Sequence, residues 1–244
     1  GLLCADPQAC ILLVTVEGLS RRLNWQDRST CVLFGDGAGA SLVTTRPLDV
    51  PGHLSAHLKS VLCSSDTDCW DLIQVGGGTH QAYELGDPVD GTFFVTMQGR
   101  EVFKHVVRAL VSISNEVLAK EGLSVEDVDL FIPHQANLRI IEAVGSRLGL
   151  PADKVFVNVD NYGNTSASSI PLAMADAFKL ERIKPGILIE FRQSYIGPAI
   201  RKYGNLFRVG DCPGDFLSNR LGVIDLRLTS GDTAVHSDML EWNS

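Results

Sequence analysis

Two consecutive stretches decide the fold: Gly99-Arg-Glu-Val-Phe-Lys-His-Val-Val-Arg-Ala-Leu-Val-Ser-Ile-Ser-Asn-Glu-Val-Leu-Ala-Lys120 and Val128-Asp-Leu-Phe-Ile132. In the first, apolar residues recur every three or four positions, which predicts a helix with one buried face. The second is a short apolar run, which predicts a buried strand. Helical and strand patterns keep alternating as far as Phe191. This α-β-α-β-α-β order predicts an α/β fold with helices packed on a sheet.

The other expected elements follow the same two patterns. We expect helices from Pro133 to Leu148 and from about Thr165 to Arg182, and strands at Cys10–Val16, Thr30–Phe34, Ser41–Thr45, Val155–Val159 and Ile187–Phe191. The continuous apolar run at Cys10–Val16 is typical of a strand covered on both faces. Residues 46 to 90 predict a strand or two and a long surface loop. Beyond about Arg201 we expect neither a periodic helix nor strand pairing.

Composition places the chain among ordinary globular proteins. Apolar residues make up 45% of its 244 residues and charged residues 20%, which argues against disorder. The net charge of −8 argues against a dedicated nucleic-acid binder, because that class is usually basic. No apolar run approaches the ~18–20 residues of a membrane helix, and no leader is visible. Six widely spread cysteines without a C-x-x-C pair favour reduced thiols, so we expect a cytoplasmic protein that holds no metal.

A glycine-rich segment, Gly35-Asp-Gly-Ala-Gly-Ala40, invites comparison with a dinucleotide-binding loop. Such a loop must open a helix whose N–H groups face a phosphate. Here Ser41-Leu-Val-Thr-Thr45 follows, and its composition predicts a strand. We therefore interpret the segment as a tight link between two strands.

His134 and Asn164 are candidate functional residues by position. Each follows a predicted strand and adjoins the start of a predicted helix, and ligands of open α/β sheets gather beyond the carboxyl ends of the strands. Two polar side chains at equivalent corners could converge on one point. From spacing alone a structural role is favoured: His134 as a hydrogen-bond donor at a helix terminus, and Asn164 as a turn residue or N-cap.

Longer motifs around these two residues change that balance. Ile132-Pro-His-Gln-Ala-Asn-Leu-Arg-Ile140 and Asn161-Tyr-Gly-Asn-Thr-Ser-Ala-Ser-Ser169 resemble β-ketoacyl-acyl carrier protein synthase III, the thiolase-fold condensing enzyme that starts fatty acid synthesis. Further segments agree in the same order: Trp25–Arg28, Phe34–Ala40, Met97–Lys104 and Arg182–Gly186. The resemblance implies a thiolase-like α/β fold.

The resemblance also implies a Cys-His-Asn catalytic set, in which His134 matches the His and Asn164 the Asn. In the family the Cys takes an acyl group from acyl-CoA. The His and Asn hold the carbonyl oxygen of a malonyl thioester while it loses CO₂, and the enolate attacks the acyl-Cys. Each neutral donor would be worth about 3–4 kcal/mol, provided that the imidazole stays neutral. No cofactor is implied, because coenzyme A enters as the thioester substrate.

Binding positions follow from the same resemblance. Arg28 matches the arginine that stacks on the adenine of coenzyme A. The positions that line the tunnel for the pantetheine arm are matched by Met97, Gly99, Phe103, Ala136 and Asn137. The basic positions at the tunnel mouth, where an acidic acyl carrier protein would dock, are matched by Lys104, Arg139 and Arg147. Read without the resemblance, Arg28 and these three residues are solvated surface charges, and Phe103 is plain core.

The chain departs from the family near both ends. Counting back through the match puts the family's nucleophilic Cys roughly 12 residues before Gly1, at a helix N-terminus that would lower its pKa. Cys4 and Cys10 are wrongly placed to replace it, and the adenine-stacking Trp is also missing. Arg192-Gln-Ser194 stands where the family has a Phe-Gly-Gly-Gly loop. We hypothesise a truncated N-terminus and a frame-shifted or fused C-terminus.

The matches divide the chain into three parts. Residues 1–48 are expected to be a remnant of the N-terminal thiolase-like half. Residues 49–200 would form the C-terminal half that carries the His and the Asn, and residues 201–244 an unassigned tail, frame-shifted or disordered. The unmated remnant is expected to expose apolar surface.

The expected activity of the intact protein is decarboxylative condensation of a short acyl-CoA with malonyl-acyl carrier protein. We expect the intact protein to be a homodimer that binds neither nucleic acid nor membrane, and the chain itself to lack condensation activity. Three alternatives stay open. One is a related acyltransferase or ketide synthase of specialised metabolism, and another is a non-catalytic thiolase-fold partner. The third, a plain CoA-binding module, is weakened by the missing Trp.

Overall fold

The computed structural model describes residues 8–44, 56–66, 69–76, 91–196, 200–209 and 223–225. Its strands are β1 (Cys10–Glu17), β2 (Gly37–Thr44), β3 (Ala56–Asp66), β4 (Ile73–Val75), β5 (Val95–Met97), β6 (Leu130–Pro133), β7 (Leu188–Ile196), β8 (Ile200–Val209) and β9 (Val223–Asp225). Its α-helices are α2 (Gly99–Lys120), α3 (Leu138–Leu148), α4 (Val159–Tyr162) and α5 (Ser169–Lys179). Its short 3-10 helices are η1 (Leu19–Arg22), η3 (Gly91–Phe93), η4 (Val125–Asp127), η5 (Ala152–Lys154) and η6 (Ser166–Ser168). None of the helices within these ranges combines the length and the apolar character that crossing a bilayer requires.

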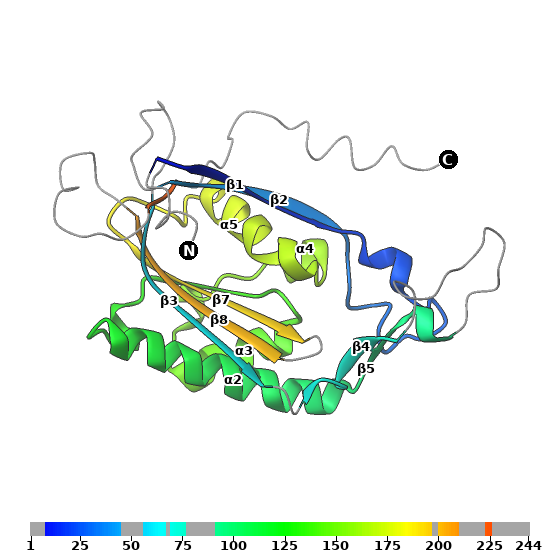
Figure 1. Cartoon of the computed structure of the whole chain (residues 1–244). Helices are drawn as coiled ribbons and strands as arrows, with labels where there is room; N and C mark the ends of the chain where they lie inside the picture. Colours follow the sequence, from blue (N-terminus) through cyan, green and yellow to red (C-terminus); the bar gives the residue numbers. More distant parts are fainter. Residues whose placement is uncertain are drawn as a thin grey trace.

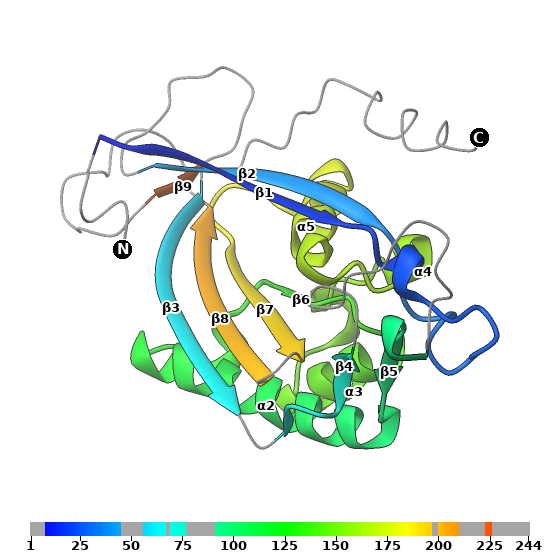
Figure 2. The same ribbon diagram turned by 45° about the vertical axis from the view of Figure 1, so that its right-hand side comes forward.

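Seven strands form one mixed sheet in the order β1-β2-β9-β3-β8-β7-β6, and β4 pairs with β5 separately. The β6–β7 pair is parallel, whereas β1–β2, β3–β8 and β7–β8 are antiparallel. Helix α5 lies between β1–β2 and β6–β7, and α2, with α3 beside it, covers the other face of β3, β7 and β8 (Figures 1 and 2). These alternating layers confirm the predicted α/β fold.

Helix α2 has the bounds predicted from its sequence, because its signal is local. Its buried residues recur every three or four positions along one face, among them Val106, Leu110 and Val117. They belong to a core cluster that also contains Phe131 of β6 and Val144 of α3. This cluster holds β6, the strand that leads to His134, against the helices.

A second core cluster lies on the opposite face of β6. It joins Leu130 and Ile132 to Met174 of α5 and Ile189 of β7. Successive side chains of a strand point to opposite faces, so Phe131 faces α2 while its two neighbours face α5. β6 is therefore buried on both faces, as its continuous apolar run predicts.

The strand predicted at Thr30–Phe34 is a series of turns instead. The Asp27 carboxylate starts the first turn by accepting a hydrogen bond from the Thr30 hydroxyl at 2.9 Å. This turn chemistry overrides the strand propensity of the apolar run. Phe34 then forms an isolated parallel bridge with Asn164, and β2 follows. The interpretation of Gly35–Ala40 as a tight link between two strands is therefore wrong, because a turn precedes it and Gly37–Ala40 belong to β2 itself, where they pair with β1.

Helix α3 begins at Leu138, later than the predicted start at Pro133. Asn137 is its N-cap, because its Oδ1 accepts a hydrogen bond from the Ile140 N–H at 2.9 Å. Residues 134–136 form a corner before the helix. The helix predicted from Thr165 likewise begins late, as η6 followed by α5.

The strand predicted at Val155–Val159 is absent. Val155 makes one isolated parallel bridge to Phe131, and the Phe156 N–H donates to the Phe131 carbonyl at 2.9 Å. Pro133, at the end of β6, has no N–H with which to continue this pairing. The chain turns into the short helix α4 instead, and the corner after α4 carries Asn164.

The expectation of no strand pairing beyond about Arg201 is wrong for two segments. β8 pairs with β3 on one side and β7 on the other, and β9 pairs with β2 and β3. β3 lies far from β8 in the sequence, and β2 and β3 lie far from β9, so these pairings leave no local pattern. The β7–β8 pairing is different, because β7 directly precedes β8 in the chain. The boundary expected after residue 200 therefore falls inside β8. Residues 210–222 and 226–244 of the expected tail, and residues 1–7, 45–55 and 77–90, lie outside the described residues.

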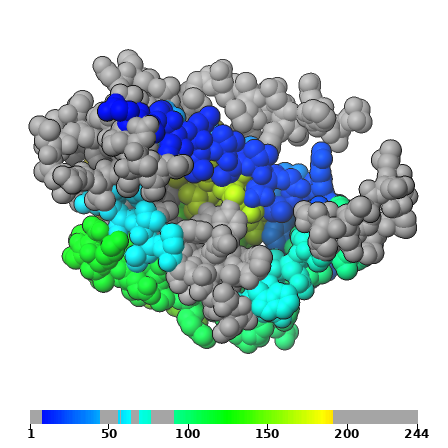
Figure 3. Space-filling model, in the orientation of Figure 1, coloured from blue at the N-terminus to red at the C-terminus, as the bar shows by residue number. Residues whose placement is uncertain are grey.

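Strand β1 lies on the surface of the molecule (Figure 3). Three of its apolar residues are 63%, 56% and 73% exposed: Leu12, Val14 and Val16. Their register partners on β2 are apolar too: Leu42, Ala40 and Ala38. The expected cover on both faces of β1 is therefore wrong, whereas the expected exposure of apolar surface in the N-terminal part is confirmed.

Candidate functional site

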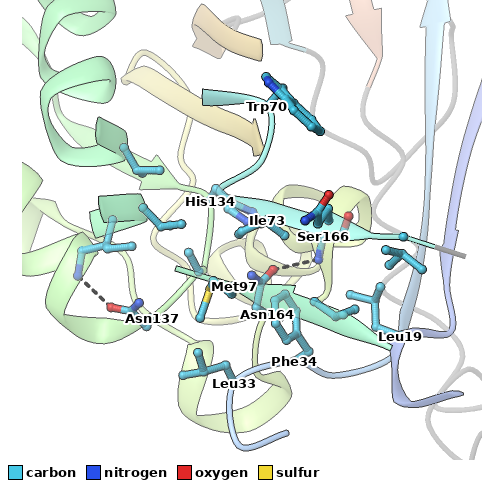
Figure 4. A pocket seen from close by; sticks show the side chains of 18 residues that line it. Leu19, Leu33, Phe34, Trp70, Ile73, Met97, His134, Asn137, Asn164 and Ser166 are labelled. Carbon is cyan, nitrogen blue, oxygen red and sulfur yellow. Dashed lines mark hydrogen bonds between the residues drawn. The ribbon is translucent and has the colours of Figure 1, made fainter. Parts of the chain in front are cut away.

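A cavity of about 510 Å³ lies between the β4–β5 pair, α2 and the corners that carry His134 and Asn164 (Figure 4). Much of its wall is apolar and comes from β4, β5 and α2: Ile73, Val75, Val95, Met97, Val102 and Val106. β4 also contributes the polar residue Gln74, and four more polar residues line the cavity from the corners beyond β6 and α4: His134, Asn137, Asn164 and Ser166. Among the described residues that line the cavity, none carries an acidic or permanently cationic side chain. Such a wall suits an uncharged chain that ends in a polar group.

His134 follows directly after β6 and is 7% exposed. Burial lowers the pKa of its imidazole from the ordinary 6.5 to about 4. Desolvation disfavours the charged form, so the ring is neutral at physiological pH. Its Nδ1 is buried, and no described residue forms a hydrogen bond with it. The corner is fixed through the main chain, where the Ala136 N–H donates to the His134 carbonyl at 2.9 Å.

Asn164 is held by the N-terminal part of the chain. Its N–H donates to the Leu33 carbonyl at 2.8 Å, and its carbonyl accepts from the Gly35 N–H at 3.0 Å. Its side-chain Oδ1 accepts from the Ser166 N–H at 3.0 Å (Figure 4). Because the oxygen is engaged in this way, the amide orientation is set and Nδ2 is the atom that can donate to a ligand.

The chain before Asn164 is anchored to α5. Asp176 accepts a hydrogen bond from Asn158 Nδ2 at 2.8 Å and another from the Tyr162 hydroxyl at 3.3 Å. Burial and this carboxylate together raise the pKa of Tyr162 to about 12. The phenol therefore stays a hydrogen-bond donor, and α4 is tied down on both sides.

The structure brings five of the residues that the resemblance indicates to one cavity: His134, Asn164, Met97, Ala136 and Asn137. It does not bring Gly99, Phe103 or Arg28 to the cavity wall. Gly99 is the first residue of α2, and Phe103 packs half-buried against the core cluster of that helix. Arg28 is exposed in the turns after η1. Asn137 has a structural task as well, since it caps α3.

The three basic residues assigned to carrier-protein docking are exposed on α2 and α3. Lys104 Nζ lies 2.7 Å from Glu101 Oε1 in an exposed ion pair, and this cation lowers the pKa of Glu101. Arg139 and Arg147 have no acidic partner within salt-bridge distance among the described residues. The two arginines therefore offer more unbalanced positive charge than Lys104 does.

Several cavity residues escaped the sequence analysis. Ser166, which orients Asn164, carries a positive φ of +48° that no local pattern announces. Trp70 and Ile73 also line the cavity, and they belong to a region predicted only as a strand or two and a loop. Leu33 and Phe34 line it too, although they were predicted to lie in a strand. None of the described cysteines lines the cavity. Within the described ranges, no three His, Cys, Asp or Glu side chains are grouped as metal ligands would be.

Comparison with known proteins shows which family the chain resembles. Two family models match: 3-oxoacyl-[acyl-carrier-protein (ACP)] synthase III over residues 2–61, and 3-oxoacyl-[acyl-carrier-protein (ACP)] synthase III C terminal over residues 118–191. The beta-ketoacyl-[acyl-carrier-protein] synthase III of Nitratidesulfovibrio vulgaris is 56% identical over 189 residues, covering 78% of this chain and 56% of the relative.

Solved structures of synthase III enzymes superpose on the chain. That from Thermus thermophilus has a TM-score of 0.72 at 37% identity, covering 86% of this chain and 62% of that one. That from Aquifex aeolicus has a TM-score of 0.68 at 39% identity, covering 82% and 57%. The chain spans little more than half the length of the curated relative. Within that span, its sequence and its thiolase-like α/β fold agree: the chain belongs to the β-ketoacyl-acyl carrier protein synthase III family.

Proposed function

We propose that the parent protein catalyses decarboxylative condensation of a short acyl-CoA with malonyl-acyl carrier protein, and that this chain carries the decarboxylation site. One observation carries the proposal: two neutral donors, His134 and Asn164, line a single cavity whose described wall has no acidic or permanently cationic side chain. Such donors suit an oxygen on which negative charge develops during the reaction.

The chemistry assigns one task to each donor. The malonyl thioester carbonyl accepts hydrogen bonds from the imidazole N–H of His134 and from Asn164 Nδ2. The bond from the α-carbon to the carboxylate breaks, CO₂ leaves, and the electron pair forms the enolate of the thioester. Each donor is worth about 3–4 kcal/mol to this step. Because burial keeps the imidazole neutral, it donates without transferring its proton.

The enolate then attacks the carbonyl of an acyl-Cys, and the Cys leaves as a thiolate. We assign this Cys to the part of the synthase III sequence that this chain does not cover. Coenzyme A is a substrate carrier here and not a resident cofactor. The apolar wall formed by Met97, Val102 and Val106 fits a pantetheine arm. Arg28, Arg139 and Arg147 would meet the nucleotide and the acidic carrier protein at the exposed surface.

The test is a half-reaction with the 244-residue chain. Purified chain is incubated with malonyl-CoA, and acetyl-CoA is measured by mass spectrometry, since protonation of the enolate by water yields it. From malonyl-CoA we expect acetyl-CoA. In a separate assay with acetyl-CoA and malonyl-acyl carrier protein, we expect no condensation product. His134→Ala and Asn164→Ala should each lower the decarboxylation rate by about 100- to 1,000-fold.

Two results would contradict the proposal. One is acetyl-CoA formation no faster than without protein, and the other is a rate that neither substitution changes. The first result would favour the alternative of a non-catalytic thiolase-fold partner.

A further inference from the structure

The end of β6 lacks a group that its neighbouring segment requires. In a parallel pair, one residue donates to a carbonyl of the neighbouring segment and accepts from the N–H two residues further on. Phe131 starts such a pairing by bridging Val155 and accepting from the Phe156 N–H. The next position in register sets Pro133 opposite Val157, and proline has no N–H.

The side chain of Gln135 supplies the missing group. Its Nε2 donates to the Phe156 carbonyl at 3.2 Å, and its Oε1 accepts from the Asn158 N–H at 2.9 Å. A strand residue opposite Val157 would make these same two bonds, because a carboxamide offers the donor and acceptor of a peptide group. Nε2 also donates to the Pro133 carbonyl at 2.9 Å. The carboxamide therefore continues the ladder where the main chain cannot.

The main chain of Gln135 is held as well. Its N–H donates to Oγ of Ser169, the first residue of α5, at 2.7 Å. Gln135 is 2% exposed, so these bonds are shielded from water. The residue next to His134 is thus bound to the end of β6, to residues 156–158 and to α5.

We propose that the Gln135 carboxamide is a positioning residue, which sets the place of His134 relative to Asn164 by bonding the His134 corner to the segment that leads to Asn164. The inference rests on the function proposed above. Asn158 begins that segment and α4 continues it to Asn164. Donors that act on one oxygen need placement within about 0.5 Å. Gln135 does not line the cavity, so it acts through His134 and not on the ligand.

Two substitutions test the carboxamide. Gln135→Met keeps the length of the side chain and removes every hydrogen bond that it makes. Gln135→Glu keeps the acceptor for the Asn158 N–H and removes the donor to the Phe156 and Pro133 carbonyls. In malonyl-CoA decarboxylation, we expect kcat to fall by about 10- to 100-fold. KM should stay within about threefold, because the cavity wall is unchanged.

Ser124→Ala is the matched control. Ser124 forms a capping box with Asp127 at η4, outside the cavity wall, so its loss destabilises the fold without touching His134. A folded Gln135→Met chain with kcat within about twofold of the wild type would overturn the proposal. The proposal would also be overturned if Ser124→Ala lowered kcat as much as Gln135→Met does. An equal rise in KM in Gln135→Met would overturn it too. Gln135→Glu decides the matter if the Met variant does not fold.

A second measurement separates this inference from the proposed function. If the wild-type chain does not decarboxylate malonyl-CoA, NMR titration of the His134 imidazole still reports on the corner. The pKa should rise from about 4 in the wild type towards 6.5 in Gln135→Met, as the corner opens to water. The described cavity wall holds no charged side chain that could cause such a rise. An unchanged pKa in the folded variant would overturn the proposal whatever the activity.

Discussion

The Ser166 N–H donates to Oδ1 of Asn164 at 3.0 Å, from a residue whose φ is +48°. A side chain other than glycine in the left-handed region carries a cost of about 1 kcal/mol or more. The surrounding hydrogen bonds hold this conformation, since Asn164 is bonded through its main chain to Leu33 and Gly35. The hydrogen bond from the strained Ser166 therefore orients the Asn164 carboxamide at the cavity.

Asn164→Asp separates the orientation of this side chain from its function as a donor. The carboxylate can still accept from the Ser166 N–H, so we expect stability to change by less than about 1 kcal/mol. The variant has no N–H to donate, and it adds negative charge beside the developing enolate. The rate of malonyl-CoA decarboxylation should fall by about 100- to 1,000-fold. A rate within about threefold of the wild type would show that Asn164 is not a donor in the reaction.

Gly35 is required by a close approach between two main-chain segments. A Cβ at this position would lie 2.0 Å from the Tyr162 carbonyl oxygen. Gly35→Ala should therefore lower the free energy of unfolding by about 1–3 kcal/mol and displace Asn164, whose carbonyl accepts from the Gly35 N–H. Urea denaturation and the decarboxylation assay measure the two effects.

Gly18→Ala is the control for that substitution. A Cβ at Gly18 would meet nothing within 4 Å, and its φ is −122°. We expect its stability to change by less than about 0.5 kcal/mol. Equal losses in the two variants would contradict the role assigned to Gly35.

The buried imidazole of His134 makes stability depend on pH. Its pKa is about 4 in the folded chain and about 6.5 when unfolded, so the unfolded state binds the proton first as the pH falls. The full stability is present above pH 6.5. It is lost progressively between pH 6.5 and pH 4, by about 3 kcal/mol in all.

His134→Gln isolates this contribution, since it keeps a polar side chain and removes the titration. Urea denaturation at pH 7, 6, 5 and 4 gives the unfolding free energy of both proteins. We expect the wild-type value, relative to that of the variant, to fall with each step to lower pH. The carboxylates contribute equally to both proteins and cancel. If the unfolding free energies of the two proteins change in parallel with pH, His134 is not neutral and buried in the folded chain.

The exposed apolar face of β1 should promote self-association. Val14 and Val16 are 56% and 73% exposed on an edge strand, where unpaired peptide groups add to the hazard. Val14→Lys with Val16→Lys should lower the association measured by light scattering over a range of concentrations. Val32→Lys is the control, because Val32 is 61% exposed but lies in a turn. If Val32→Lys reduces self-association as strongly, the effect comes from net charge and not from the apolar face of β1.

Local signals in the sequence determined part of this architecture. The bounds of α2 follow from an apolar period that the helix itself repeats, and β6 follows from a run buried on both faces. The two long motifs indicated His134 and Asn164 as site residues, and the structure brings both to one cavity. The roles assigned to Arg28 and Phe103 stay predictions, since neither residue lines the cavity.

Tertiary structure alone decided the rest. Val155–Val159 has the composition of a strand, but Pro133 of the adjacent β6 has no N–H to pair with it. The side-chain amide of Gln135 makes the two hydrogen bonds instead. β8 pairs on one side with β7, which directly precedes it, and on the other side with β3, which lies too far along the chain to leave a mark on the sequence of β8. The cavity likewise exists only where segments from residues 19 to 166 meet. Sequence periodicity reports what a segment buries, whereas hydrogen-bond partners and shared cavities depend on which distant segments arrive beside it.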